Sequence, residues 1–383
     1  MSAPAAPDLG FVEPAYGTRS LGDVVPAVAT ALGLRIPGGG TDGATTRLEL
    51  PDAESYVVFL VDGLGARLIE RYAHVAPYLA TLLGRSTPGT AGVPSTTATS
   101  LTSLGTGLPP GAHGLVGFSA RVPGTGTLLN HLFWDASVDP EEWQPHPTAL
   151  GTLARAGAEV TTVNKREFQG SPLTQVSTRG ATFVGADRVG ERIAAAVASS
   201  ARRPSLTYLY DSDLDWTGHR YGVASAPWLQ QLAMVDAEAE HLREALPPSC
   251  RLLIVADHGM VDLAPDQRID VDDDPALLDG VAMVGGEARF RHLYARPGAA
   301  DDIAATWRSH LGDRAEVLTR EEAVARGWFG RVDPVVAPRL GDVVVAGREV
   351  GVFSRRLFEY ETTLVGLHGS LSADEMLIPF LVD

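Results

Sequence analysis

Unbroken apolar runs recur along the chain, and each stops abruptly at an acidic residue. Three of these runs, each with the residue that follows it, are YVVFLV (56–61, then Asp62), SLTYLY (205–210, then Asp211) and RLLIVA (251–256, then Asp257). Strands buried on both faces lack the alternation of half-exposed strands, so such runs are typical of a parallel sheet covered by helices. A fourth run, MLIPFLV (376–382), contains Pro379, which suits a strand at the sheet edge.

Apolar residues between these runs recur with helical spacing. Helices are predicted over residues 20–33, 64–72, 78–84, 97–106, 187–199 and 226–246. Alternating strands and helices predict an α/β fold, with a mostly parallel sheet sandwiched by helices. Ligands of such sheets bind beyond the carboxyl ends of the strands, where the three acidic residues stand.

The same patterns divide the chain into three parts. Residues 1–50 are predicted to form an N-terminal extension packed on the core, which comprises residues 51–265 and 366–383. Residues 266–365 are predicted to form a smaller inserted α+β subdomain. Its short strand patterns, ARFRHLYARPG, AEVLTR and GDVVVAG, surround one predicted helix at 301–311.

Composition narrows the class of protein. The 383 residues carry a net charge of −16 and a pI near 5.0, which argues against a duplex nucleic-acid partner because phosphate binding needs clustered basic residues. Cys250 is the only cysteine, which excludes an intrachain disulfide and a cysteine metal cluster. We expect no membrane span and a cytoplasmic location, because we see neither a long apolar stretch nor a signal-peptide pattern.

Aspartate and histidine residues gather at the predicted strand ends. Asp215 and His219 are four residues apart, which places them on one side of a helical turn. Asp257 and His258 are adjacent, and Gly259 permits a turn that lets both reach one site. Each pair alone is more often solvated, but several such elements at the ligand-binding edge indicate a site for Zn²⁺ or Mn²⁺. The candidate ligands are Asp62, Asp215, His219, Asp257, His258 and His368.

A run rich in hydroxyl side chains, GVPSTTATSLTSLGTG, covers residues 92–107. Serine and threonine are common at helix N-termini, where they cap free amides. The same position suits a nucleophile, since the amides and the helix dipole receive a phosphate oxyanion. A threonine hydroxyl is a weak nucleophile unless a metal or base activates it. A metal ion held by the predicted ligands would provide this activation, so the two features support the same interpretation.

The motifs together resemble the type I phosphodiesterase/nucleotide pyrophosphatase family of the alkaline phosphatase superfamily. The resemblance rests on five motifs, which occur in this order: FLVDGLG, VPSTTATSLTSLGTGLPPGAHGL, DLDWTGHRYG, VADHGM and LHGSLSADEMLIP. The resemblance implies an alkaline phosphatase-like core and two divalent metal ions, most readily Zn²⁺, with Mn²⁺ as the alternative. It assigns one ion to Asp62, Thr97, Asp257 and His258, and the other to Asp215, His219 and His368. It also implies that Thr97, rather than its neighbour Thr96, is the nucleophile.

The implied activity is hydrolysis of phosphodiester or pyrophosphate bonds in a small anionic phosphorylated substrate, through a covalent phosphothreonine. A phosphonoacetate-type phosphonate hydrolase and a phosphomonoesterase are the alternatives, and a non-catalytic binding protein of the same fold is the least favoured. Ser100, three residues after Thr97, and Lys165, the only lysine, are candidates for contacts to substrate. The sequence predicts neither the physiological substrate nor the oligomeric state.

Several further residues have alternative interpretations. Asp211 and Asp213 compete with Asp215 as ligands, but they lack the four-residue step to a histidine. His113 is expected to support a loop rather than take part in chemistry. The aromatic candidates for stacking on a base or an apolar leaving group, each more commonly a packing residue, are Phe133, Trp134 and Trp216.

Overall fold

The computed structural model describes residues 10–36 and 46–383. The remainder of the predicted N-terminal extension, residues 1–9 and 37–45, lies outside this description. The extension contributes a short 3₁₀ turn, Leu21–Asp23, and helix α1 (Val24–Ala31), where one continuous helix over 20–33 was predicted. The buried face of α1 packs into the main core of the protein.

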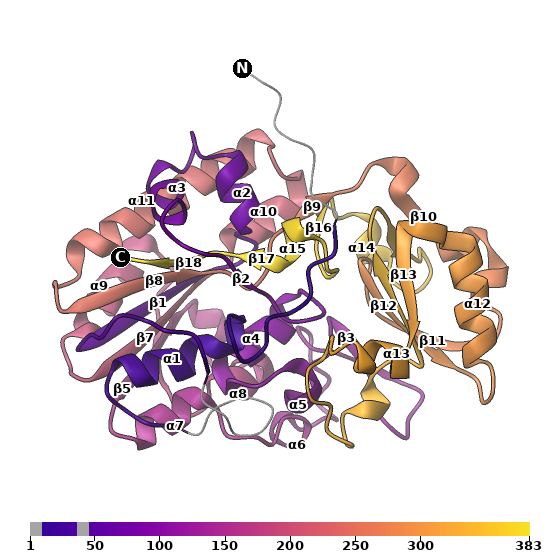
Figure 1. Cartoon of the computed structure of the whole chain (residues 1–383), viewed down its shortest axis with the longest axis horizontal. Helices are drawn as coiled ribbons and strands as arrows, with labels where there is room; N and C mark the ends of the chain where they lie inside the picture. The colour runs from indigo at the N-terminus through magenta and orange to yellow at the C-terminus, as the bar shows by residue number, and fades with distance from the viewer. Residues whose placement is uncertain (1–9, 37–45) are drawn as a thin grey trace.

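A six-stranded sheet forms the centre of the larger part of the molecule (Figure 1). Its strands, in spatial order, are β18 (Phe380–Val382), β8 (Cys250–Val255), β1 (Ser55–Val61), β7 (Ser205–Asp211), β5 (Glu159–Asn164) and β6 (Thr182–Gly185). All pairs are parallel except β18 with β8. The central strand β1 is buried along its whole length, as its unbroken apolar run predicts.

Helices cover both faces of this sheet, which confirms the predicted α/β class (Figure 1). One face carries α1, α4 (Thr97–Thr106), α7 (Ala149–Arg155) and α8 (Pro172–Thr178). The opposite face carries α2 (Ala66–Arg71), α3 (Pro77–Leu83), α9 (Val189–Ser200), α10 (Asp213–Tyr221) and α11 (Ala226–Ala245). Within the described residues, no helix combines the length and apolar character needed to cross a membrane.

A second, antiparallel sheet lies beside the first and belongs to the segment between β8 and β18 (Figure 1). Its strands, in spatial order, are β11 (Val281–Glu287), β12 (Phe290–Ala295), β14 (Val343–Gly347) and β13 (Ala315–Thr319). Helices α12 (Ala300–Leu311) and α13 (Arg320–Ala325) accompany it, and α12 buries Trp307 against a separate apolar cluster. Helix α14 (Glu359–Thr362) and strand β16 (Gly366–Leu367) then lead the chain back toward the central sheet, where β16 pairs with β9 (Val261–Asp262).

The predicted continuous strand over residues 376–382 is wrong. Residues Ala373–Met376 form helix α15, and Pro379 separates a two-residue strand β17 (Leu377–Ile378) from β18. Strand β17 pairs with β2 (Gly89–Thr90), while β18 pairs with β8 at the sheet edge. Proline cannot donate a ladder hydrogen bond, so the chain changes partner at this residue.

Candidate metal centre and active site

Two central strands end side by side and carry the first group of site residues. Asp62 follows β1 and Asp257 lies two residues after β8, and these parallel neighbours pair Leu60 with Val255. Both carboxylates therefore reach the same edge of the sheet. The main-chain N–H of Gly63 donates to Oδ1 of Asp257 over 3.1 Å, which ties the two strand ends together.

The turn after His258 depends on close packing rather than on an unusual backbone conformation. Gly259 is not among the glycines with positive φ. A Cβ on Gly259 would lie 2.0 Å from the carbonyl oxygen of Asp374 and 3.0 Å from Cα of Gly65. Glycine is needed here because two other segments touch its backbone, and that contact fixes His258 against the strand ends.

His258 is the centre of the first ligand group. Its Nε2 lies 3.4 Å from Oδ1 of Asp62 and 3.3 Å from Oδ2 of Asp257. The same nitrogen lies 3.3 Å from Oγ1 of Thr97, the first residue of α4. One possible ligand atom from each of Asp62, Asp257 and His258 lies within 4.8 Å of the other two, which is close enough for the three to share a metal ion.

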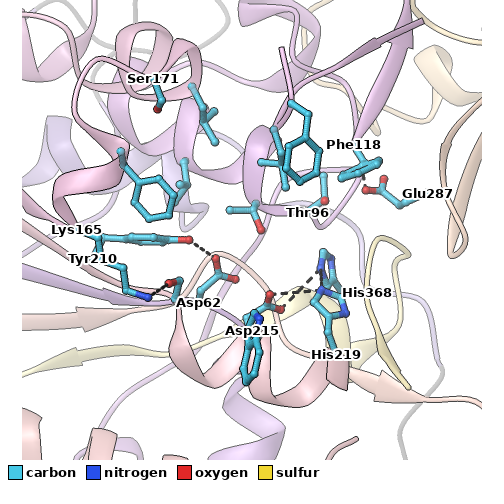
Figure 2. A pocket seen from close by; sticks show the side chains of 18 of the residues that line it. Asp62, Thr96, Phe118, Lys165, Ser171, Tyr210, Asp215, His219, Glu287 and His368 are labelled. Atoms are coloured by element: carbon cyan, nitrogen blue, oxygen red, sulfur yellow. Dashed lines mark hydrogen bonds and ion pairs between the residues drawn. The ribbon is translucent and has the colours of Figure 1, made fainter. Parts of the chain in front are cut away.

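A second group lies next to the first and comes from two more segments (Figure 2). Asp215 and His219 lie one turn apart on α10, with Oδ2 of Asp215 3.4 Å from Nε2 of His219. His368 follows β16; its Nε2 lies 3.2 Å from Nε2 of His219 and 3.8 Å from Oδ1 of Asp215. His258 is near enough to Asp215 and His368 to serve this group as well.

All three histidine rings are oriented by main-chain carbonyls. The Nδ1 atoms of His219, His258 and His368 lie 2.7, 2.9 and 3.0 Å from carbonyl oxygens of Gly366, Gly259 and Ser95, respectively. A carbonyl can only accept, so each Nδ1 carries the proton and each Nε2 presents a lone pair. Histidines that bind metal ions commonly donate their other ring N–H to a carbonyl in this way, which fixes the ring and leaves Nε2 free for an ion.

The carboxylates carry oxygens that no protein donor satisfies. Oδ1 of Asp62, Oδ1 of Asp215 and Oδ2 of Asp257 are buried and without a hydrogen-bond partner among the described residues. Burial, followed by the charges of Asp257 and Asp215, raises the pKa of Asp62 well above its ordinary value. Burial likewise raises the pKa of Asp257. A bound divalent cation would satisfy these oxygens and offset their mutual repulsion, so the residues fit such an ion.

Thr97 and Thr96 both line the adjacent cavity, but their positions differ. Thr96 is the N-cap residue of α4 and is 3% exposed. Thr97 begins the helix, is more exposed, and directs its hydroxyl to His258. The geometry therefore brings Thr97, and not Thr96, into contact with the ligand groups.

The two aspartates that compete with Asp215 as ligands, Asp211 and Asp213, form ion pairs with other residues instead. Asp211 lies at the end of β7 and forms a buried ion pair of 2.5 Å with Arg192 of α9. Asp213 pairs with Lys165 over 2.6 Å. Of the three acidic residues in this segment, only Asp215 belongs to the ligand groups.

Of the two residues predicted to contact substrate, Lys165 lines the cavity and Ser100 does not. Lys165 follows β5, lines the cavity, and donates to Ser212 over 3.0 Å as well as to Asp213. Ser100 is fully buried and does not line the cavity; its hydroxyl donates 2.8 Å to the main-chain carbonyl of Asp257. The prediction that Ser100 contacts substrate does not fit this position, because one helical turn places it behind Thr97.

A cavity of about 750 Å³ opens in front of Thr97. Its wall includes the aromatic rings of Phe118, Phe168 and Tyr210, and its rim includes Phe133 and Trp216, which are 75% and 60% exposed. Trp134 packs against other rings instead, with centroids 5.7 Å from His131 and 6.4 Å from Trp143. His113 is buried and hydrogen-bonded to Ser103 over 2.9 Å, in a structural position.

Two residues of the cavity, Tyr210 and Glu287, are not among the candidates from the sequence. The hydroxyl of Tyr210, on β7, donates to Oδ2 of Asp62 (Figure 2). Glu287, at the end of β11, reaches the cavity from the second sheet. Side chains alternate in direction along a strand, so Tyr210 shares a face of β7 with Tyr208, which also lines the cavity; nothing in the local sequence GGEAR marks Glu287.

The site thus combines paired Asp and His groups at the carboxyl edge of an α/β sheet with a threonine at the N-terminus of a facing helix. Residues 56–371 match the family Type I phosphodiesterase / nucleotide pyrophosphatase, and the chain belongs to that family. Venom phosphodiesterase 2 of Crotalus adamanteus is 25% identical over 226 residues, covering 55% of this chain. The chain spans about a quarter of the length of that relative, 27%.

Solved structures show the same fold at lower identity. Murine ectonucleotide pyrophosphatase/phosphodiesterase 5 superposes with a TM-score of 0.67 at 17% identity, covering 85% of this chain and 87% of that one. It has also been solved as an inactive threonine-to-alanine variant in complex with AMP. Phosphonoacetate hydrolase from Sinorhizobium meliloti, in complex with phosphonoformate, has a TM-score of 0.64 at 19% identity, with coverage of 87% and 90%.

Proposed function

We propose that this protein hydrolyses phosphodiester or pyrophosphate bonds, with Thr97 as the nucleophile and two divalent ions, Zn²⁺ or alternatively Mn²⁺, as cofactors. One observation carries the proposal: the Thr97 hydroxyl lies 3.3 Å from Nε2 of His258, within a group of buried carboxylates that lack partners. The first ion would be held by Asp62, Asp257 and His258 and the second by Asp215, His219 and His368. His258 is near enough to assist the second group.

The side chains of this protein have separable tasks in that reaction. Bound cations supply charge neutralisation and activation of a hydroxyl at neutral pH. Oγ1 of Thr97 loses its proton to water and attacks phosphorus in line, and the bond to the leaving oxygen breaks as the Thr97 ester forms. The N-terminus of α4 faces the phosphoryl oxygens with free amides. Water then hydrolyses the phosphothreonine and restores the hydroxyl.

The cavity favours an organic substituent on the phosphorus. The rings of Phe118, Phe168 and Tyr210 offer apolar area close to Thr97, and aromatic side chains bind planar groups well. Lys165 adds a cation at the sheet edge, although Asp213 partly neutralises it. The AMP complex of the murine neighbour supports a nucleoside phosphate as one member of the substrate class.

A second candidate is hydrolysis of a carboxylated phosphonate. The Sinorhizobium meliloti neighbour with bound phosphonoformate supports it, as does Lys165, whose ammonium could face a carboxylate. A phosphomonoesterase and a binding protein without turnover remain the lesser alternatives.

Turnover on metal-loaded protein tests these proposals. The substrates are bis-p-nitrophenyl phosphate, the nitrophenyl ester of thymidine monophosphate, p-nitrophenyl phosphate and phosphonoacetate, each with and without chelator. The proposed function predicts chelator-sensitive turnover that is fastest on the two diesters. Fastest turnover of phosphonoacetate or of the monoester would replace it with one of the alternatives, and a metal-loaded protein without turnover would favour the binding protein.

A further inference from the structure

Tyr210 connects the wall of the cavity to the first ligand group. It lies on β7, is 6% exposed, and lines the cavity. Its hydroxyl donates a hydrogen bond to Oδ2 of Asp62, which Figure 2 shows as a dashed line. The ring of Phe168 packs edge-on against the ring of Tyr210, with centroids 6.4 Å apart. The side chain of Tyr210 is therefore held both at its ring and at its hydroxyl.

The register of the central sheet brings Tyr210 and Asp62 together. Strands β1 and β7 are parallel, and Leu60 is the partner of Tyr210. The ladder continues past the end of β1, because the main-chain N–H of Asp62 donates to the carbonyl of Asp211 over 2.9 Å. Paired residues point to the same face of a sheet, and side chains alternate along each strand. Asp62 therefore shares a face with Leu60 and with Tyr210.

The two carboxylate oxygens of Asp62 face different neighbours. Oδ2 accepts from Tyr210, whereas Oδ1 lies 3.4 Å from Nε2 of His258. This nitrogen presents a lone pair, so it gives Oδ1 no proton, and Oδ1 has no donor among the described residues. Asp62 thus directs one oxygen at a protein donor and the other at the first ligand group.

Asp257 shows the same division, with main-chain donors. Its Oδ1 accepts from the N–H groups of Gly63 over 3.1 Å and His258 over 3.0 Å. Its Oδ2 lies 3.3 Å from Nε2 of His258 and has no donor among the described residues. Both carboxylates therefore present one oxygen to the same imidazole nitrogen. The main chain fixes this orientation for Asp257, and a side chain, Tyr210, fixes it for Asp62.

We propose that Tyr210 is a positioning residue that holds Asp62 through Oδ2, so that Asp62 binds the first metal ion through Oδ1 alone. The inference rests on the proposed function, because it concerns the metal centre of that site. Residues that orient a metal ligand through a hydrogen bond contribute to metal affinity as well as to geometry. Without the Tyr210 hydroxyl, the carboxylate of Asp62 would be free to turn and to bring Oδ2 toward the ion.

Phenylalanine variants at two positions of β7 test this role. Tyr210→Phe keeps the ring and removes the hydroxyl. Tyr208→Phe is the matched control: Tyr208 shares the strand and its face, is buried, and makes no hydrogen bond through its hydroxyl to any described residue. Competition with a chromogenic chelator measures the zinc dissociation constants. We expect the constant of one ion to rise about tenfold or more in Tyr210→Phe, and the other constant, and both constants in Tyr208→Phe, to stay within about threefold of the wild type.

The visible spectrum of cobalt-substituted protein separates positioning from a general loss of stability. The absorption of Co²⁺ depends on the number and arrangement of its ligands, which change if both oxygens of Asp62 approach the ion. At saturating cobalt, the bands of Tyr210→Phe should differ from the wild type in position and intensity, and those of Tyr208→Phe should match it. Zinc dissociation constants of Tyr210→Phe that all stay within about threefold of the wild type, or a cobalt spectrum identical to the wild type, would overturn the role of Tyr210.

Metal binding is measured without substrate, so this inference and the proposed function can fail separately. Metal-loaded wild-type protein that hydrolyses none of the substrates would reject the proposed function, and the comparison of Tyr210→Phe with the wild type would still decide the role of Tyr210. Wild-type protein that binds neither zinc nor cobalt would overturn both.

Discussion

The imidazole rings of His258 and His368 stack, with centroids 3.6 Å apart and planes inclined by 16°. His258 ends the run that follows β8, and His368 returns only after the whole second sheet has been traversed. The stack therefore brings together, at the candidate metal centre, the two ends of the segment that contains the second sheet. The site is complete only when the segment between β8 and β18 has folded back onto the central sheet.

His258 should matter for both ligand groups. Among the described residues, it belongs both to the group with Asp62 and Asp257 and to the group with Asp215 and His368. His258→Ala should therefore lower the zinc content measured by mass spectrometry at saturating metal more than His219→Ala does. His241→Ala, an exposed histidine on α11, is the matched control. Unchanged zinc content in His258→Ala would remove this residue from the ligand set.

Thr97→Ala should abolish turnover of diester substrates, with a loss of at least about 1,000-fold. Most of the bound metal should remain, because the carboxylates and imidazoles stay in place. Thr97→Ser should retain part of the activity through its hydroxyl, while Thr125→Ala, at an exposed position, should match the wild type. Initial rates and metal content measured on the same samples decide the matter; near-full activity of the alanine variant would refute the nucleophile assignment.

Arg192 should be essential for stability. From α9 it donates to Glu238 over 2.8 and 2.6 Å and to Asp211 over 2.5 Å, and all three side chains are buried. Arg192→Ala would leave two buried carboxylates unpaired, which costs about 3–5 kcal/mol. The exposed Arg188→Ala should change the free energy of unfolding by less than about 0.5 kcal/mol. Urea unfolding followed by circular dichroism measures both, and a loss below about 1 kcal/mol for Arg192→Ala would contradict the network.

His113 should make the protein sensitive to acid. Burial lowers the pKa of this imidazole to about 3, and its Nδ1 accepts from the N–H of Leu115. The unfolded chain takes up a proton near pH 6.5 while the folded chain does not. The stabilisation is thus present above pH 6.5 and is lost as pH falls toward 3, by up to about 1.4 kcal/mol per pH unit. Between pH 6 and 4, the free energy of unfolding should therefore fall less steeply with falling pH in His113→Gln than in the wild type, by up to this amount. The same slope in both proteins would contradict the lowered pKa of His113.

Gly105 sets the distance between α4, which carries Thr97, and α8, which lines the cavity. A Cβ at this position would lie 1.7 Å from the carbonyl oxygen of Ser177. Gly105→Ala should therefore cost about 1–3 kcal/mol and raise KM, because α8 must move. Gly190→Ala in α9 meets no atom within 4 Å and should be stabilising by about 0.4–1 kcal/mol. Thermal unfolding and steady-state kinetics test the pair, and equal effects of the two substitutions would show that the contact is unimportant.

Periodicity predicts the central sheet and its ligand-binding edge because buried parallel strands have a simple signature. The runs before Asp62 and Asp257 correspond to β1 and β8 within one residue at each end. The four-residue step from Asp215 to His219 is realised on α10. These features depend on local sequence, and the family is confirmed.

Other features depend on tertiary contacts that no local pattern encodes. Ser100 faces the strand end behind Thr97 because of the helical turn between them. Glu287 reaches the cavity only through the pairing of β11 with β12. The division into an N-terminal extension, a core and an inserted subdomain, the roles of individual site residues and the cytoplasmic location stay predictions.

Anomalous diffraction at the zinc edge, from crystals of the metal-loaded protein, tests the central claim most directly. The account predicts one peak among Asp62, Asp257 and His258 and a second among Asp215, His219 and His368, both beside the Thr97 hydroxyl. Fully loaded protein whose peaks lie away from these side chains would contradict it.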